Sequence, residues 1–209
     1  MSVSDQARSI LELAGALKTG HFILSSGLHS DRYCQCATLF ERAELAERCA
    51  RLMLQVMPGG FKVDVVLSPA LGGVLWGYEL SRVLGVRNVF AERAPGSAVF
   101  ELRRGFELRA GERVLLAEDV VTTGGSVSEL VPLVEGAGAV VAGFAVIADR
   151  SKGSFKPTAP LFALTELNFE TWKPESLPAH LRDVPAYKPG SRAPVGVAKD
   201  KQISQEVSR

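Results

Sequence analysis

Short apolar runs alternate along this chain with longer amphipathic segments, and the alternation predicts its fold. Helices are expected at about 4–17, with Ser4 as the N-cap, and at 38–57, 74–84 and 126–137. Buried strands are expected at 63–67, 89–92, 114–117, 139–148 and 161–164. Strands alternating with helices favour an α/β fold, a doubly wound and mainly parallel central sheet flanked by helices. Ligands bind such sheets at the carboxyl ends of the strands.

Segments outside this alternation are expected at the edges of the fold. Residues 18–37 hold two strand-like stretches around a Ser-Ser-Gly turn, which predicts a small N-terminal hairpin beside the main sheet. Residues 99–103 and 106–108 are expected to form a ribbon. The 209 residues suit one domain, taken as 1–192, and a loosely ordered tail is expected at 193–209.

The segment 114–129 holds the densest group of candidate functional residues. Its apolar run leads directly to Glu118 and Asp119, and Ser126 with Glu129 has the spacing of a capping box at a helix start. Free N–H groups there, with glycines and hydroxyls, predict a phosphate cradle. Adjacent carboxylates accept hydrogen bonds from a sugar's vicinal hydroxyls and raise the local affinity for Mg²⁺. Between the acids and the helix stand Val120, Val121, Thr122, Thr123, Gly124 and Gly125.

Two common nucleotide-binding loops are excluded by the sequence. No Gly-Lys-Ser/Thr occurs, so the chain has no loop for a nucleoside triphosphate. Gly136-Ala137-Gly138 precedes a strand instead of following one, so it is not a dinucleotide loop. A second strand opens into Ala70, Leu71, Gly72 and Gly73 at a helix start, which is a second candidate anion cradle.

Composition adds little to this picture. The formal net charge is +1 with 22% charged residues, which gives no sign of a nucleic-acid or membrane surface. The N-terminus lacks a signal-peptide pattern and no apolar run reaches ~18 residues, so a cytoplasmic location is expected. Cys34, Cys36 and Cys49 suggest neither a secreted disulfide framework nor a zinc site.

The segment 114–126 resembles the phosphoribosyl-diphosphate (PRPP) signature of the type I phosphoribosyltransferases. The resemblance implies that the acidic pair binds the ribose hydroxyls and that residues 120–126 bind the 5-phosphate. Residues 70–73 would then hold the pyrophosphate. Mg²⁺ is implied as the cofactor, carried by the PRPP diphosphate with no metal site on the protein.

Residues 21–33, together with Asp149-Arg150, resemble the orotate phosphoribosyltransferases within that superfamily. The resemblance implies transfer of the phosphoribosyl group to N1 of orotate in pyrimidine biosynthesis. Arg150 and Thr122 would bind the orotate carboxylate, and Tyr33 would stack on the ring or wall it. A homodimer is implied in which a mobile loop, here beginning at Arg93, reaches the partner's site.

The catalytic assignments are Arg93 and Asp119, and two alternatives stay open. Many members carry lysines where this chain has Ser25 and Gly72, and their mobile loop has more cations than Arg93 followed by the later pair Arg103-Arg104. Transfer to another base, such as a purine, is the first alternative. The second is a PRPP-binding regulator that acts through nucleic acid, for which neither a basic surface nor a DNA-binding extension is visible.

Overall fold

The computed structural model describes residues 1–24 and 26–189, and these form two compact units. The first unit contains residues 1–18 and 33–169, and the second contains 19–24, 26–32 and 170–189. Ser25 and the predicted tail at 193–209 lie outside the described residues.

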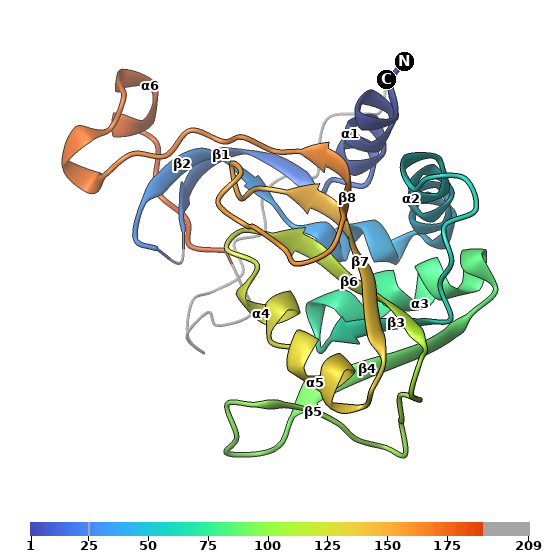
Figure 1. Ribbon diagram of the computed structural model, residues 1–209. Coiled ribbons are helices and arrows are strands. Elements are labelled where there is room, and N and C mark those ends of the chain that lie inside the picture. The colour runs from blue at the N-terminus through green and yellow to red at the C-terminus, as the bar shows by residue number, and fades with distance from the viewer. Residues whose placement is uncertain (25, 190–209) are drawn as a thin grey trace. The chain divides into compact units, whose positions relative to one another are not determined.

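A six-stranded sheet with the order β5-β4-β3-β6-β7-β8 forms the centre of the first unit (Figure 1). All neighbouring strands run parallel except β5, which is antiparallel to β4. The strands are β3 (Val65–Pro69), β4 (Arg87–Arg93), β5 (Phe100–Leu102), β6 (Arg113–Val121), β7 (Val140–Asp149) and β8 (Leu161–Glu166). The predicted mainly parallel α/β sheet is confirmed. The predicted ribbon is wrong in part, because 106–108 is not a strand.

Helices cover both faces of this sheet, so its central strands are buried on two sides. On β6, Leu115 and Ala117 face one apolar cluster while Val114 and Leu116 face the other. The alternation follows from the two-residue period of a strand. The first cluster packs beneath α1 (Val3–Leu13), α2 (Ala43–Val56) and α3 (Gly72–Leu84), and the second beneath α4 (Gly125–Ser128) and α5 (Val131–Gly136).

Two predicted helices begin elsewhere than expected. The first is capped by Ser2, whose hydroxyl accepts from Asp5 N while the Asp5 carboxylate accepts from Ser2 N, a reciprocal box that the expected cap Ser4 does not form. This helix ends at Leu13, and Leu17 already begins a strand. The helix expected from 38 begins at Ala43, because the chain first makes a separate 3₁₀ turn, η1 (Cys36–Glu41).

The helix predicted at 126–137 is two short helices, and its capping box does not form. The N-cap is Gly124, and the Glu129 carboxylate pairs with Arg93 instead of closing a box. Pro132 explains the interruption, since proline has no N–H to donate to the preceding turn and its ring crowds that turn's carbonyl.

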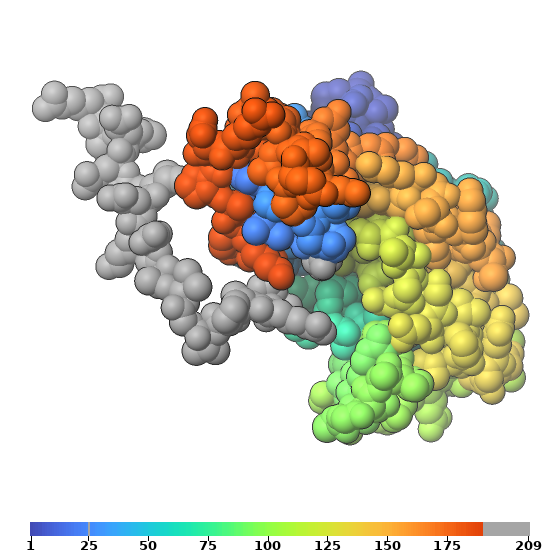
Figure 2. Space-filling model, turned by 90° about the vertical axis from the view of Figure 1, so that its left-hand side faces the viewer, coloured from blue at the N-terminus to red at the C-terminus, as the bar shows by residue number. Residues whose placement is uncertain are grey.

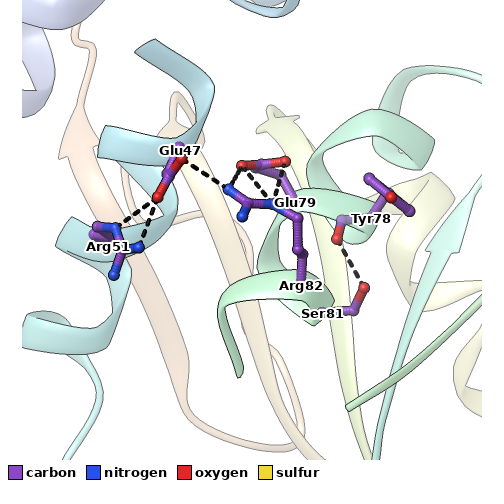
Figure 3. A network of polar contacts seen from close by, with 6 residues as sticks. All are labelled: Glu47, Arg51, Tyr78, Glu79, Ser81 and Arg82. Carbon is purple, nitrogen blue, oxygen red and sulfur yellow. Dashed lines mark hydrogen bonds and ion pairs between the residues drawn. The ribbon is translucent and has the colours of Figure 1, made fainter. Parts of the chain in front are cut away.

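Packing joins α2 and α3, and a polar network covers the contact. Glu47 of α2 accepts from Arg51 at 2.6 Å and pairs with Arg82 of α3 at 3.0 Å, while Arg82 also pairs with Glu79 (Figure 3). Apart from Glu79, these side chains are partly or largely exposed, so each pair contributes little to stability. Trp76 of α3 contributes more, because it is fully buried and donates from Nε1 to Ala145 O at 3.1 Å.

The second unit is built on the predicted N-terminal hairpin. Strands β1 (Leu17–Ile23) and β2 (His29–Cys34) form a two-stranded sheet, and the later chain adds η2 (Pro174–Ser176) and α6 (Ala179–Arg182). Buried His21 bridges these parts, because Nδ1 lies 2.7 Å from Val184 O and Nε2 lies 2.6 Å from His29 Nδ1. Backbone pairing of His29 with Trp172 adds to this connection.

Gly143 accommodates an irregularity in the middle of β7. The register between β6 and β7 shifts by one residue there, as Val114 faces Val141 but Leu115 faces Gly143. A β-carbon on Gly143 would lie 3.0 Å from Pro160 O and 2.9 Å from the Phe162 ring. The absence of a side chain therefore lets β8 approach β7 closely.

Gly143→Ala should lower the free energy of unfolding by about 1–3 kcal/mol, because the added methyl group overpacks a rigid part of the sheet. Gly136→Ala is the matched control, since nothing lies within 4 Å of a β-carbon at that helical position. It should be neutral or stabilise by roughly 0.5–1 kcal/mol. Urea denaturation of both variants measures the difference. Equal stabilities would show that the sheet relaxes at no cost.

Candidate active site

The strand order places the candidate site at the carboxyl ends of β3 and β6. From β3 the chain continues to β4 on one side, and β6 then pairs with β3 on the other side. Loops that leave two such neighbouring strands in opposite directions leave a crevice between them, which is where α/β sheets bind ligands. The two loops here are residues 70–73 and 122–126, the two predicted cradles.

Two glycines let the loop after β3 lie close to the end of β6. A β-carbon on Gly72 would stand 3.3 Å from Asp119 Oδ1, and one on Gly73 would stand 2.8 Å from Ala117 O. The second position therefore requires glycine, because a backbone oxygen cannot move aside. The peptide bond between Ala70 and Leu71 is cis, and Ala70 N donates to Ala91 O at 2.8 Å.

Glu118 and Asp119 lie within β6, not beyond its end as the sequence predicted. The strand continues to Val121, and Glu118 pairs with Val146 of β7. Because side chains alternate along a strand, the two carboxyls point to opposite faces. Glu118 lies toward Ser126 at α4, and Asp119 lies toward Gly72 at α3. Each cradle thus has one carboxyl group beside it.

Both carboxyl groups are held partly out of water, and this raises their pKa values. Burial, and then repulsion from Asp119, raises the pKa of Glu118 to about 8, while hydrogen bonding from Ser126 opposes the shift. Burial also raises the pKa of Asp119, although Val120 N donates to its Oδ1 at 2.8 Å. Glu118 therefore favours its protonated form at neutral pH, and a cationic or hydroxyl-bearing ligand would favour the ionised forms of both groups.

The loop after β6 could bind an anion mainly through hydroxyls and backbone N–H groups, with little help from a helix dipole. Thr122, Thr123 and Ser126 are exposed, and the helix that follows them has only four residues. So short a helix has a weak dipole, because the helix predicted at 126–137 is interrupted. Gly124 has φ +76°, and a β-carbon there would meet the Phe155 ring at 2.1 Å, so this turn needs glycine.

The loop after β3 leads into a longer helix whose first turn has no side-chain cap. Helix α3 has 13 residues, and its N-cap residue Leu71 provides no side-chain hydrogen bond. Leu71 and Gly72 are exposed. Uncapped N–H groups with a dipole of this length are suited to an anion.

Arg150 is a cation without an anionic partner in the described part of the chain. Its backbone N donates to Val121 O at 2.8 Å, which fixes it beside the end of β6. The side chain is partly buried, and its Nε has no hydrogen-bond partner among the described residues. Its guanidinium carbon lies 5.1 Å from the centre of the Phe169 ring. Phe169 was missed by sequence reasoning, since nothing in its spacing marks it.

The other candidate arginines are already paired. Arg93 forms an ion pair with Glu129 at 2.7 Å and lies 3.8 Å over the Phe100 ring. Arg103 and Arg104 both pair with Glu92. The structure thus holds Arg93 at the base of the β4–β5 loop and does not bring it to the acidic pair. This loop (light green) and the chain after β6 (yellow) both reach the surface on the face shown in Figure 2.

Cys34, with Tyr33 next to it in β2, lies near the same end of the sheet. Tyr33 is a partly buried residue of β2, and its neighbour Cys34 is close enough to Arg150 and Asp119 for both charges to act on the thiol. Cys34 Sγ lies 3.5 Å from Cys36 Sγ, and a hydrogen bond between the thiols lowers the pKa of Cys34. Within residues 1–24 and 26–189, no group of three or more His, Cys, Asp or Glu side chains could hold a metal ion. No described helix could cross a membrane.

Comparisons with known proteins agree with this geometry. The phosphoribosyl transferase domain family matches residues 37–181. Similar relatives include orotate phosphoribosyltransferases from Caldanaerobacter subterraneus (43% identity over 90% of this chain and 97% of the relative) and from Rhizorhabdus wittichii (47%, 91% and 97%). The Aeropyrum pernix orotate phosphoribosyltransferase structure gives a TM-score of 0.67 at 23% identity, covering 76% of this chain and 92% of that one. An adenine phosphoribosyltransferase from Thermoanaerobacter pseudethanolicus gives 0.57 at 19%, covering 65% and 88%.

The raised pKa of Glu118 predicts a pH-dependent stability of the ligand-free protein. Between its ordinary value of 4.5 and about 8, the folded chain keeps a proton that the unfolded chain has released. The free energy of unfolding should therefore fall as pH rises through this window. Glu118→Gln should flatten that slope in urea denaturation. Glu135→Gln, at an exposed position of α5, should leave it unchanged. Identical slopes in all three proteins would show that Glu118 titrates normally.

Proposed function

The chain belongs to the orotate phosphoribosyltransferase family, and on that premise we propose how its residues carry the reaction. Orotate phosphoribosyltransferase activity serves pyrimidine biosynthesis. The phosphoribosyl group of PRPP passes to N1 of orotate, which gives orotidine 5-monophosphate and pyrophosphate. The relatives at 43–47% identity are orotate phosphoribosyltransferases, and this argues against the alternative of a purine acceptor.

The observation that carries the residue assignment is the unpaired state of Arg150. A partly buried cation without an acceptor is costly, so an anion from outside the described chain is the partner that completes it. The orotate carboxylate suits a guanidinium, which can donate two parallel hydrogen bonds to it. A purine carries no carboxylate and would leave the arginine unpaired. Exposed Thr122 supplies a further hydroxyl, and Tyr33 a ring to stack on orotate or wall it.

We assign PRPP to the crevice between the two loops. Glu118 and Asp119 would accept hydrogen bonds from the ribose hydroxyls. Backbone N–H groups and hydroxyls of residues 120–126 would hold the 5-phosphate, and the uncapped start of α3 at Ala70–Gly73 would hold the pyrophosphate. Burial raises the pKa values of the two carboxyls, so they suit a ligand that brings a cation and favours their ionised forms. Mg²⁺ carried on the diphosphate fits that donor set and would neutralise charge on the leaving pyrophosphate.

The reaction depends more on stabilising the charges that develop in the transition state than on a general base. As pyrophosphate departs, the sugar carbon gains positive character, and ionised Asp119 would stabilise it. N–H groups at the start of α3 would stabilise the leaving oxygens. Orotate is already anionic, so no strong general base is needed. Arg93 would add positive charge at the pyrophosphate, which first requires its pair with Glu129 to open.

Arg150→Ala should raise the KM for orotate at least about 30-fold, since removing one partner of a charge pair costs ~2–5 kcal/mol. The KM for PRPP should stay within about threefold, because Arg150 is not assigned to PRPP. Uracil, which lacks the carboxylate, should be a poor substrate with either protein. Steady-state assays of pyrophosphate release measure all three, with exposed Arg51→Ala on α2 as control. A loss that falls on PRPP instead would show that Arg150 has another role.

We also propose a homodimer with shared active sites. Leu71, Leu75 and Tyr78 are 86%, 54% and 57% exposed and follow the spacing of one face of α3. Exposed apolar side chains in such a row are suited to a second copy of the chain. Because α3 begins at the pyrophosphate loop, a copy on this face would lie beside the site. Arg93 of one chain would then act in the site of its partner.

Subunit mixing tests the shared site. Arg93→Ala and Asp119→Asn homodimers should each lose at least about tenfold in turnover. If Arg93 acts in the partner's site, mixed heterodimers have one site with both defects and one with neither. Activity should then return toward half of wild type per heterodimer. Glu129→Gln is the control, and it should keep activity because it only frees Arg93. A tagged heterodimer that forms but stays inactive would rule out the shared arrangement.

We further propose that residues 1–192 act as one phosphoribosyltransferase domain, with a tail after residue 192. Both relatives align over 97% of their own length, and the family match includes parts of both compact units. A cytoplasmic location is proposed from the three free cysteines, which suit a reducing compartment.

A further inference from the structure

Phe169 lies beneath the guanidinium of Arg150 and is fixed more firmly than the arginine it contacts. Its ring is 8% exposed and belongs to the apolar cluster shared with α1, α2 and α3. The chain just before it is anchored, since Leu167 is 1% exposed and its N donates to Asp149 O at 2.9 Å. The ring is therefore part of the core, and the 5.1 Å contact places a long flexible side chain over a rigid surface.

Arg150 has little else to fix its guanidinium. Within residues 1–24 and 26–189, the side chain makes neither a hydrogen bond nor an ion pair, and its Nε is buried without an acceptor. Arginine has many rotamers, and a free guanidinium would lose that freedom on binding a carboxylate. A ring that already holds the group in place reduces this loss.

An aromatic ring also supports the guanidinium without using the N–H donors that would bind an anion. The face of the ring attracts the cation through its quadrupole. It accepts no strong hydrogen bond, so the five N–H donors of the guanidinium stay free for an anion. A carboxylate at the same place would also hold the arginine, but it would use those donors and neutralise the charge. Arg93 shows this second arrangement, because Glu129 pairs with it.

We propose that Phe169 is a positioning residue for the acceptor substrate, holding Arg150 ready for the carboxylate of orotate. The proposal rests on the assignment of Arg150 to orotate made above. It goes beyond that assignment by giving a buried residue outside the PRPP-binding loops a part in acceptor specificity. Phe169 acts through Arg150 and not on the reacting atoms.

The test compares two buried phenylalanines of the same apolar cluster. Phe169→Leu keeps apolar volume and removes the ring under Arg150, and Phe169→Tyr keeps the ring. Phe162→Leu is the matched control, since Phe162 is 7% exposed and packs against Phe61. Phe169→Leu should raise the KM for orotate on the order of tenfold, the scale of a partly desolvated cation–π contact. The KM for PRPP should stay within about twofold, and Phe169→Tyr and Phe162→Leu should keep the KM of wild type for orotate.

A double-mutant cycle separates positioning from a general loss of structure. In an Arg150→Ala background, Phe169→Leu should have no further effect on kcat/KM for orotate, because no guanidinium is left to position. An effect that persists there, or a rise in KM for PRPP equal to that for orotate, would overturn the proposal. If Phe169→Leu does not fold, Phe169→Met replaces it, since methionine fills irregular apolar space.

The same measurements distinguish failure of this proposal from failure of the assignment on which it rests. Orotate use that falls in Arg150→Ala but not in Phe169→Leu, or in its replacement Phe169→Met, would overturn the positioning role alone. Orotate use that is unchanged in Arg150→Ala would overturn the role of Arg150 and the positioning role with it. The proposal is supported when Phe169→Leu and Arg150→Ala both act on orotate and their effects do not add.

Discussion

Both faces of β6 are buried, and this constraint decides where the two carboxyl groups of the site can point. Along a strand with apolar clusters on each side, consecutive residues must diverge. Glu118 therefore turns toward the loop at α4 and Asp119 toward the loop at α3. An acidic pair on adjacent positions can serve both cradles of the crevice at once, whereas acids two residues apart would both serve the same one.

The same burial makes the two carboxyl groups costly to ionise. Burial raises the pKa values of both acids, and repulsion from Asp119 adds to the shift of Glu118. A sugar diol and a cation on a diphosphate would replace the lost hydration. Ionising these acids in the folded chain therefore carries an electrostatic cost, which the proposed substrate would relieve, as is usual for active sites.

Sequence reasoning found the sheet because buried parallel strands are continuous apolar runs. It failed where a tertiary partner overrides the local pattern. The expected end of β6 at the first acid is wrong because β7 continues the pairing as far as Val121 and Asp149. The expected capping box is wrong because Pro132 interrupts the helix and Glu129 forms an ion pair with Arg93 instead. The two glycine-containing loops do follow β3 and β6 as expected, and their role as anion cradles stays a prediction.

The sequence shows where the arginines are but not which groups they contact, and in this structure the contacts distinguish Arg150 from the other candidate arginines. Arg93, Arg103 and Arg104 each have a carboxylate within ion-pair distance, so their charges are already balanced in the single chain. Arg150 has an aromatic ring instead, which stabilises the cation without balancing it. A balanced arginine must break a contact before it can bind an anion, and an unbalanced one need not. Arg150 could therefore bind an anion without breaking an ion pair within the described chain, while the role proposed for Arg93 at the pyrophosphate requires its pair with Glu129 to open.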